Sequence, residues 1–286
     1  MHHRLLLLLL GGGALSPPPL HAQDSMPPMG AMAGVAASRP PAESLRTADQ
    51  VGAYLTAVPL GTVPDLRGLD LSGLDFSGLD FRKADLSGAR LVATRFDRAN
   101  LFATDLTDAV ATEASFLEAN LDGCTLRRTD LRRAQFRRAS LFATIIEAAD
   151  LRGADLRDTR IIAYLRKANL AGANLAGTNA GADPGNQSMG VMRAQFVGAD
   201  LSGADLTGAN LFKADFSYAS LTGARLNDAN LGFAELVGTD LSRADVTGAD
   251  LAQANLYGAI FTGATGVASL RGLDRARNRD KAVFDQ

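Results

Sequence analysis

The feature that most constrains this chain is a period of five residues, which begins at Pro64 and continues to about residue 263. The stretch "ADLSGADLTGANLFKADF" at residues 199–216 shows it well. A large apolar residue stands at the centre of each unit (position i), a small residue at i−2, often Asp or Asn at i−1, and often Gly at i+2. Neither the helical period of about 3.6 nor the strand period of about 2 matches this spacing over long distances. The pattern therefore predicts short extended steps joined by corners.

Each step offers one large and one small apolar side chain to an interior. Gly permits the unusual backbone of a corner, and Asp or Asn bonds the local backbone there. Four steps close a square coil, and successive coils stack about 4.8 Å apart, as strands do. We expect these positions to form the core, with Cys124 packed at a small position: Leu86, Leu101, Phe136, Leu206 and Cys124.

The units "ADLSG-ADLTG-ANLFK-ADFSY" resemble the pentapeptide-repeat family, whose motif is A(D/N)LXX. The resemblance implies an all-β fold, a right-handed quadrilateral β-helix with four pentapeptides in each coil. It says little about activity. The best-known relatives are acidic DNA mimics that protect topoisomerases, from which this chain departs by its export signal and by its mixture of Arg with Asp. In some relatives the C-terminal segment joins two rods, so the resemblance allows a homodimer through that end.

The N-terminal segment is typical of a signal peptide. A polar start is followed by an apolar run from Leu5 to Leu15, which is too short to span a membrane. We expect cleavage after Ala22, and hence a periplasmic or secreted protein with no membrane span in the mature chain. All three histidines lie before this point, so the mature chain has no His-based catalytic or metal site.

The remaining organisation follows from composition and pattern. Residues 23–42 are a Met-, Pro- and Ala-rich leader, 43–63 an N-terminal cap with a short helix over 43–58, 64–263 the repeats, and 264–286 a C-terminal cap or tail. The net charge of −2 gives no reason to expect a nucleic-acid partner. No cofactor is expected, and the single cysteine excludes an internal disulfide.

The repeat is interrupted twice. The step from Ile161 to Leu165 is one residue short, and the step from Ala180 to Phe196 is sixteen residues. Together with the steps between them they span 35 residues, a multiple of five, so we expect one continuous rod with a loop inserted at about 181–192. A second interpretation stays open, in which Met189–Arg193 forms an irregular unit and shifts every later face by one.

Long loops in compact folds are more often functional than ornamental. The loop residues that we expect to contact a partner are Asn186, Gln187, Met189, Met192 and Arg193.

An arginine-rich run, "TLRRTDLRRAQFRRAS" at residues 125–140, has two interpretations. It is either an anion-binding belt or part of a ladder of ion pairs between coils. Residues 20 apart should stack, and this offset predicts five pairs: Arg128 with Asp108, Arg133 with Glu113, Arg138 with Glu118, Glu147 with Arg127, and Asp158 with Arg138. The pairing favours the ladder.

A row of apolar residues is expected on one face, at the outward position i+1. Phe102, Phe142 and Ile162 share it, Asp122 interrupts it, and Phe212 joins if the break adds no face. Such a row indicates either a surface for a protein or glycan partner, or a stripe covered by the loop or a terminus.

Two metal hypotheses are weaker. Asp65, Asp85 and Asp105 should stack and would attract a cation such as calcium, although each is expected to bond its own corner. Met26, Met29 and Met32 are soft ligands for copper, although the leader there is of low complexity.

The sequence thus predicts a non-enzymatic exported scaffold or binding module for a protein or glycan. Two alternatives are a polysaccharide-active β-helix enzyme, which would need paired carboxylates outside the repeat pattern, and a topoisomerase-binding DNA mimic.

Overall fold

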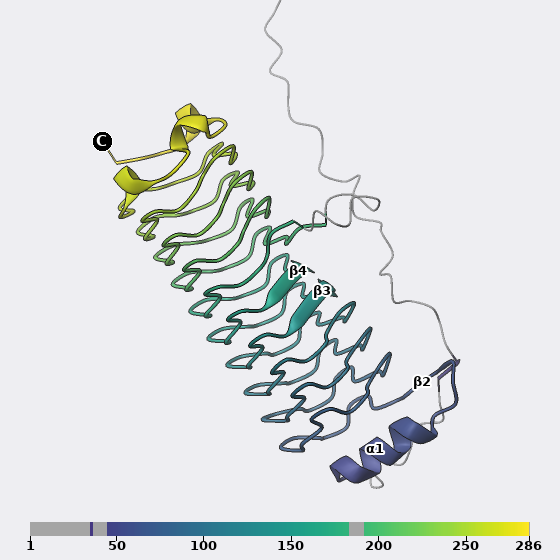
Figure 1. Ribbon diagram of the computed structural model, residues 1–286. Helices are drawn as coiled ribbons and strands as arrows, with labels where there is room; N and C mark the ends of the chain where they lie inside the picture. Colours follow the sequence, from purple (N-terminus) through teal and green to yellow (C-terminus); the bar gives the residue numbers. More distant parts are fainter. Residues whose placement is uncertain (1–34, 37–44, 183–191, 286) are drawn as a thin grey trace, which may run out of the picture.

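The computed structural model describes residues 35–36, 45–182 and 192–285. These residues form a stack of similar coils, with a helix at one end and the C-terminus at the other (Figure 1). Residues 20 apart pair in parallel, for example Asp65 with Asp85 and Asp85 with Asp105, so each coil contains four five-residue units. The chain is therefore a four-sided β-helix. No helix among the described residues is both long and apolar enough to cross a membrane.

Most of the pairing occurs at single residues, because each side of a coil is only one short step long. The backbone N–H of Leu66 donates to the Asp85 carbonyl at 2.8 Å, and Gly68 donates to Ser87 at 2.9 Å. Within the described residues, four segments are long enough to count as strands: β1 (Val35–Ala36), β2 (Thr62–Val63), β3 (Ser140–Ile145) and β4 (Arg160–Tyr164). β1 pairs with β2, and β3 with β4, in parallel.

The interior is filled by the i and i−2 side chains. Leu86, Leu101, Phe136, Leu206 and Cys124 have no exposed surface. Phenylalanines in successive coils stack, with ring centroids 5.3 Å apart for Phe96–Phe116 and 4.8 Å for Phe116–Phe136. Threonine is tolerated at i−2 because its hydroxyl donates to a carbonyl of the preceding coil, as Thr94 does to Leu71 at 2.9 Å.

The corners have the geometry that the sequence pattern predicts. The residue at i+2 adopts a left-handed backbone, with φ of 65° at Gly88 and 66° at Gly203. Many corners place a larger residue in this conformation, for example Ala93 at 53° and Phe233 at 58°. The carboxylate or amide at i−1 accepts the N–H of residue i+1, as Asp70 does from Ser72 at 3.1 Å.

Helix α1 (Ala48–Ala57) lies at the first coil. Its N-terminus is closed by a capping box, in which Thr47 accepts from the Gln50 backbone and the Gln50 side chain accepts from the Thr47 backbone. Val51 is fully buried, and the Tyr54 hydroxyl accepts the Asp65 N–H at 3.0 Å. The large i−2 residues Leu74 and Leu79 pack against the core at this end.

The C-terminal segment was expected only to be a cap or tail, but it winds one further coil with a period of six. Thr265, Arg271, Arg277 and Val283 pair with residues of the coil below. Each longer unit begins with a left-handed residue followed by a turn of 3-10 helix: η3 (Val267–Ser269) after Gly266, η4 (Leu273–Arg275) after Gly272, and η5 (Arg279–Lys281) after Asn278. The extra residue enlarges each corner without breaking the pairing.

The rod continues through the break in the repeat. The short step lies in β4, which runs extended through a position where other units turn, and its register with β3 shifts between Phe142 and Ile145. After the insertion, Gln195 pairs with Tyr164 and Asn210 pairs with Asn179. The insertion therefore adds no face, and the interpretation in which Met189–Arg193 forms an extra unit is wrong.

Candidate functional site

One face of the rod carries Asn at i−1 more often than the other three, and we call it the asparagine face. Its paired i−1 residues are Asp80, Asn100, Asn120, Ser140, Arg160, Asn179, Asn210, Asn230 and Asp250. Aspartate is the commonest residue at the corresponding positions of the other faces. β3, β4 and the start of the insertion also lie on this face, so the irregular elements of the fold gather here.

The asparagine side chains form a ladder along the rod. The Asn210 amide donates to Asn179 Oδ1 at 2.9 Å, and the Asn230 amide donates to Asn210 Oδ1 at 3.3 Å. Asn210 Oδ1 also accepts the Phe212 N–H at 3.3 Å. The amide oxygen of Asn210 thus has two donors, whereas its NH₂ group uses one of two hydrogens. Asn179 and Asn210 are both exposed.

The expected apolar row lies on the asparagine face. Phe102 is 43% exposed, and Phe142 is half-buried beneath the Arg160 guanidinium, which lies 4.4 Å from the ring centroid. Phe212 joins the row, because its carbonyl accepts the N–H of Ala182 from the coil before. Asp122 interrupts the row, and its carboxylate accepts the Phe142 N–H at 2.9 Å.

Ile162 corrects one expectation. It is on the predicted face but is only 3% exposed, so it offers almost no contact surface. The unit of Ile162 lacks the left-handed corner residue, so β4 runs extended through this unit. Ile162 therefore does not stand at a turn, where its side chain would be exposed.

An aromatic cluster that the sequence reasoning missed is formed by Phe212, Lys213 and Phe233. The two rings meet edge to face with centroids 5.5 Å apart, and Lys213 Nζ lies 5.4 Å from one centroid and 5.9 Å from the other. Phe233 is 45% exposed. It was missed because it stands at i+2, the corner position, rather than at i+1. The signal available in the sequence was a bulky residue where Gly is common.

Two glycines at i+1 make room for this cluster and for the ladder. Neither Gly181 nor Gly232 has a positive φ, so the backbone does not require glycine at either position. A Cβ on Gly232 would lie 3.2 Å from a ring carbon of Phe212, and a Cβ on Gly181 would lie 2.6 Å from the Asn210 amide nitrogen. Both glycines therefore leave room for a side chain of an adjacent coil, Asn210 in the coil after Gly181 and Phe212 in the coil before Gly232.

The insertion residues are described in part. Arg193 forms an ion pair with Asp215 at 3.2 Å, and Met192 is half-buried. Asn186, Gln187 and Met189 lie outside the described residues, and so do the leader methionines Met26, Met29 and Met32. Their proposed contacts remain predictions.

The arginine-rich run forms the predicted ladder rather than an open belt. Arg128 pairs with Asp108 at 2.6 Å, Arg133 with Glu113 at 2.5 Å, Arg138 with Glu118 at 3.3 Å, and Arg127 with Glu147 at 3.3 Å. The fifth pair was predicted wrongly, because Asp158 contacts Arg137, at 3.8 Å, and not Arg138.

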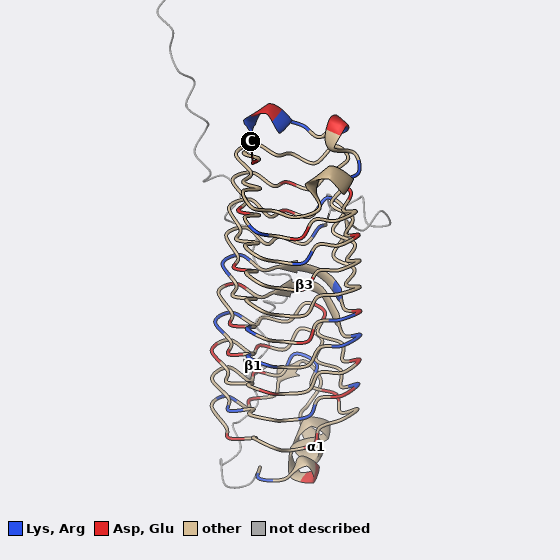
Figure 2. Ribbon diagram, turned by 90° about the vertical axis from the view of Figure 1, so that its left-hand side faces the viewer, with Lys and Arg blue, Asp and Glu red and all other residues tan. Residues whose placement is uncertain are grey.

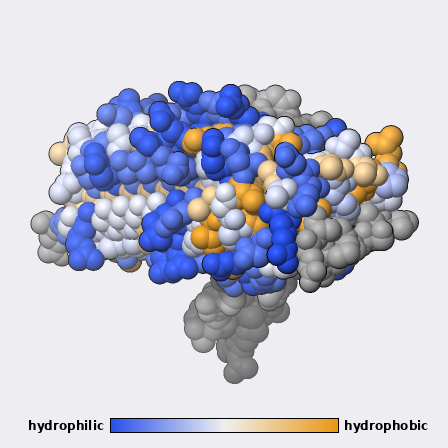
Figure 3. Space-filling view, turned by 90° about the horizontal axis from the view of Figure 1, so that it is seen from below, coloured by the Kyte–Doolittle hydropathy of each residue, from blue (hydrophilic) through white to orange (hydrophobic). Residues whose placement is uncertain are grey.

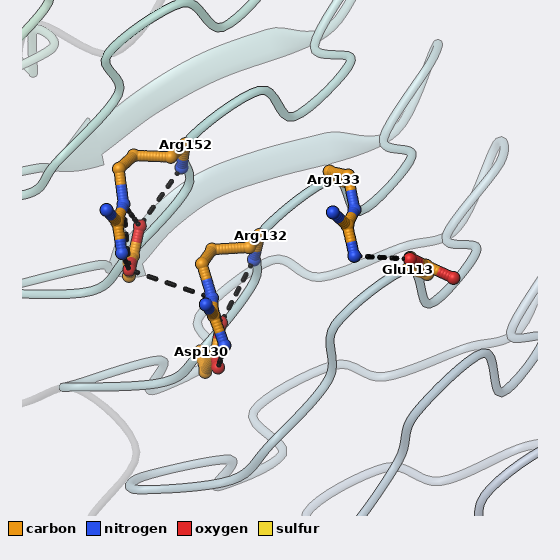
Figure 4. Close-up of polar contacts among 6 residues, drawn as sticks. Glu113, Asp130, Arg132, Arg133 and Arg152 are labelled. Carbon is orange, nitrogen blue, oxygen red and sulfur yellow. Dashed lines mark hydrogen bonds and ion pairs between the residues drawn. The ribbon is translucent and has the colours of Figure 1, made fainter.

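Some arginines of this ion-pair ladder also pair with an acid of their own five-residue unit. Arg132 pairs with Asp130 of its own unit at 2.6 Å and approaches Asp150 of the next coil at 3.9 Å (Figure 4). Hydrogen bonds from Arg132 and Arg128 hold the pKa of Asp130 and Asp108 below the usual range. Basic and acidic segments accordingly alternate along the edges of the rod (Figure 2).

The stacked acids Asp65, Asp85 and Asp105 hold corners. Asp65 accepts from Arg67 at 2.7 Å, and Asp85 and Asp105 accept the N–H groups of Ser87 and Thr107. No group of His, Cys, Asp and Glu side chains suited to a metal ion occurs among the described residues.

The surface of the rod is mainly hydrophilic but has apolar groups exposed on it (Figure 3). Seen from below, hydrophobic residues gather in the middle of the rod within a mainly hydrophilic surface (Figure 3).

Cys124 is not among the exposed groups. Its thiol donates to the Leu101 carbonyl, and burial raises its pKa far above the usual value.

Comparison with known proteins agrees with this geometry. The crystal structure of HetL from the cyanobacterium Nostoc, a pentapeptide repeat protein involved in heterocyst differentiation regulation, matches with a TM-score of 0.68 and 30% identity. The match covers 84% of this chain and all of HetL. QnrB1, a plasmid-mediated fluoroquinolone resistance protein, matches 73% of this chain and 85% of its own at 19% identity and a TM-score of 0.36.

A search of curated protein sequences gives no match. The family model for pentapeptide repeats matches residues 65–98, 94–133, 119–158, 192–228 and 224–263. Members of this family fold as right-handed quadrilateral β-helices, which agrees with the four-sided coil and the pairing at an offset of 20 residues. The chain belongs to the pentapeptide-repeat family.

Proposed function

We propose that this protein is an exported, non-catalytic binding module whose contact surface is the asparagine face together with the insertion at 181–192. The observation that carries the proposal is that the irregular elements of the fold lie on one face. The missing turn in β4, the start of the insertion, the asparagine ladder and the aromatic cluster of Phe212, Lys213 and Phe233 all occur there.

A catalytic role has less support. Many of the described carboxylates, such as Asp85 and Asp130, bond corner N–H groups or arginines, and the one described thiol is buried. The DNA-mimic alternative also loses support, since a mimic of nucleic acid needs unpaired acids, whereas Arg128, Arg133 and Arg138 neutralise the acids beside them. Export rests on the apolar run at Leu5–Leu15 and on the small residues that follow it.

The test is capture from an envelope extract with the mature chain as bait. One variant replaces Gly181–Met192 by a regular pentapeptide, and a second is Phe233→Gly. Arg133→Ala, which removes an exposed pair on another face, is the control. We expect both face variants to lose the captured molecules and the control to keep them. Equal capture by all four proteins would refute the proposal.

A further inference from the structure

We propose that the asparagine face binds an acidic polysaccharide, a strand of uronate-bearing sugars that lies along the rod over the cluster of Phe212, Lys213 and Phe233. This inference rests on the proposed function and names the class of its ligand. It is carried by three properties of the described face: the hydrogen-bond groups left over, the charge, and the exposed rings.

At the centre of the ladder, Asn210 leaves a donor over. Asn210 Oδ1 is occupied by the Asn230 amide and the Phe212 N–H, while one hydrogen of the Asn210 NH₂ group stays unused within the ladder. A ligand that contacts Asn210 must therefore supply an acceptor to this group. Carboxylate, hydroxyl and ring oxygens of a sugar acid do so, whereas a basic peptide would bring further donors.

The charge of the face points the same way. Across four successive coils, the described positions 160–163, 179–182, 210–213 and 230–233 contain no Asp or Glu. Lys213 is the cation of the aromatic cluster, and it has three N–H donors above the two rings. On the other faces, by contrast, arginines lie beside carboxylates and leave little net charge.

The rings supply the apolar part of the contact. Phe233 is exposed at a corner, and Phe212 lies flat because Gly232 has no side chain to lift it. The apolar face of a sugar ring stacks on such a surface. Asn179, Asn210 and Asn230 lie in three successive coils, about 4.8 Å apart, so this part of the face presents one amide side chain per coil to a polymeric ligand.

The experiment measures binding of the mature chain to polygalacturonate by isothermal titration calorimetry, with hydroxyethyl cellulose as the uncharged polymer. Phe233→Gly removes a ring and relieves its backbone strain, so the variant should fold as well as the parent. Tyr218→Gly is the matched control, because Tyr218 also holds a left-handed backbone, at φ 59°, is 62% exposed and lies over a glycine, but on a different face.

We expect polygalacturonate to bind more tightly than the neutral polymer, and to bind less tightly as salt is added. Phe233→Gly and Lys213→Gln should each weaken it about tenfold, the loss of a typical strong contact. Tyr218→Gly should leave binding unchanged. Lys213→Gln should keep the thermal transition of the parent, and the two glycine variants should unfold at the same or a higher temperature than the parent, because both relieve a left-handed corner.

Three results would each overturn the inference: no binding of polygalacturonate, equal binding of the neutral polymer, or equal weakening by Tyr218→Gly. If polygalacturonate does not bind while capture from the envelope extract still requires Phe233, the ligand class is wrong and the binding module stands.

Discussion

Substituting alanine by glycine should have opposite effects at neighbouring corner positions. Ala93 and Ala148 occupy i+2 with φ of 53° and 55°, and both are exposed. A left-handed backbone costs a non-glycine residue about 1–2 kcal/mol. Glycine loses about 0.5–1 kcal/mol more than alanine through the entropy of the unfolded chain. The net result of Ala93→Gly should be a gain of about 0.5–1 kcal/mol.

Ala171 provides the matched control, because it stands at i+1, one residue before the left-handed Gly172. Ala171→Gly brings the entropic cost without relief of strain, so it should destabilise by about 0.5–1 kcal/mol. Ala93 and Ala148 are on separate coils, and their effects should add to about 1–2 kcal/mol.

The assay is thermal unfolding followed by circular dichroism, with each variant compared with the parent chain. A change of 1 kcal/mol should shift the midpoint by about 2–4 °C in a domain of this size. We expect the Ala93/Ala148 double variant to unfold at a higher temperature and Ala171→Gly at a lower one. A shift of the same sign in both would show that corner strain does not govern this fold.

Three further predictions concern pH, the last coil and the thiol. Hydrogen bonds lower the pKa of Asp70, Asp108 and other corner carboxylates, so the stability that these groups contribute is present above the unfolded pKa of about 3.9 and is lost as the pH falls through the lower folded values. The unfolding midpoint should therefore be constant from pH 7 to 5 and fall below about pH 4, and a fall between pH 7 and 5 would contradict this. Gly266→Ala should destabilise the last coil more than Gly203→Ala does, because a Cβ on residue 266 would lie 2.5 Å from the Thr247 backbone, whereas a Cβ on residue 203 meets nothing within 4 Å. Amide hydrogen exchange at residues 265–285 measures the stability of this coil, and equal exchange in the two variants would refute the prediction. Cys124 should react with a thiol reagent only after denaturation, as counted by absorbance, and rapid native labelling would disprove its burial.

The fold was predictable because one period controls it. Each unit repeats the same inward pair and the same corner, so the faces, the stacking and four of the five ion pairs predicted around the arginine-rich run follow from an offset of 20 residues. The period did not settle the face of Phe212, because it does not say whether the insertion adds a unit; the pairing of Asn210 with Asn179 does so.

Three details could not be read from that period. The last coil uses six-residue units, so a search for a period of five does not find the corner residues Gly266, Gly272 and Asn278, although their equal spacing was visible in the sequence. Ile162 is buried because the missing residue removes its turn, which is a three-dimensional effect. Phe233 was overlooked because a side chain at i+2 is normally a corner feature.

The central claim is that the asparagine face is the surface that meets the partner, and hydroxyl-radical footprinting tests it most directly. Exposed rings on different faces serve as internal reporters: Phe233 on this face, and Tyr218 and Tyr257, which are 62% and 56% exposed, on another. With the captured envelope fraction bound, oxidation of Phe212 and Phe233 should fall while that of Tyr218 and Tyr257 stays unchanged. Protection of the two tyrosines with Phe233 still oxidised would contradict the account.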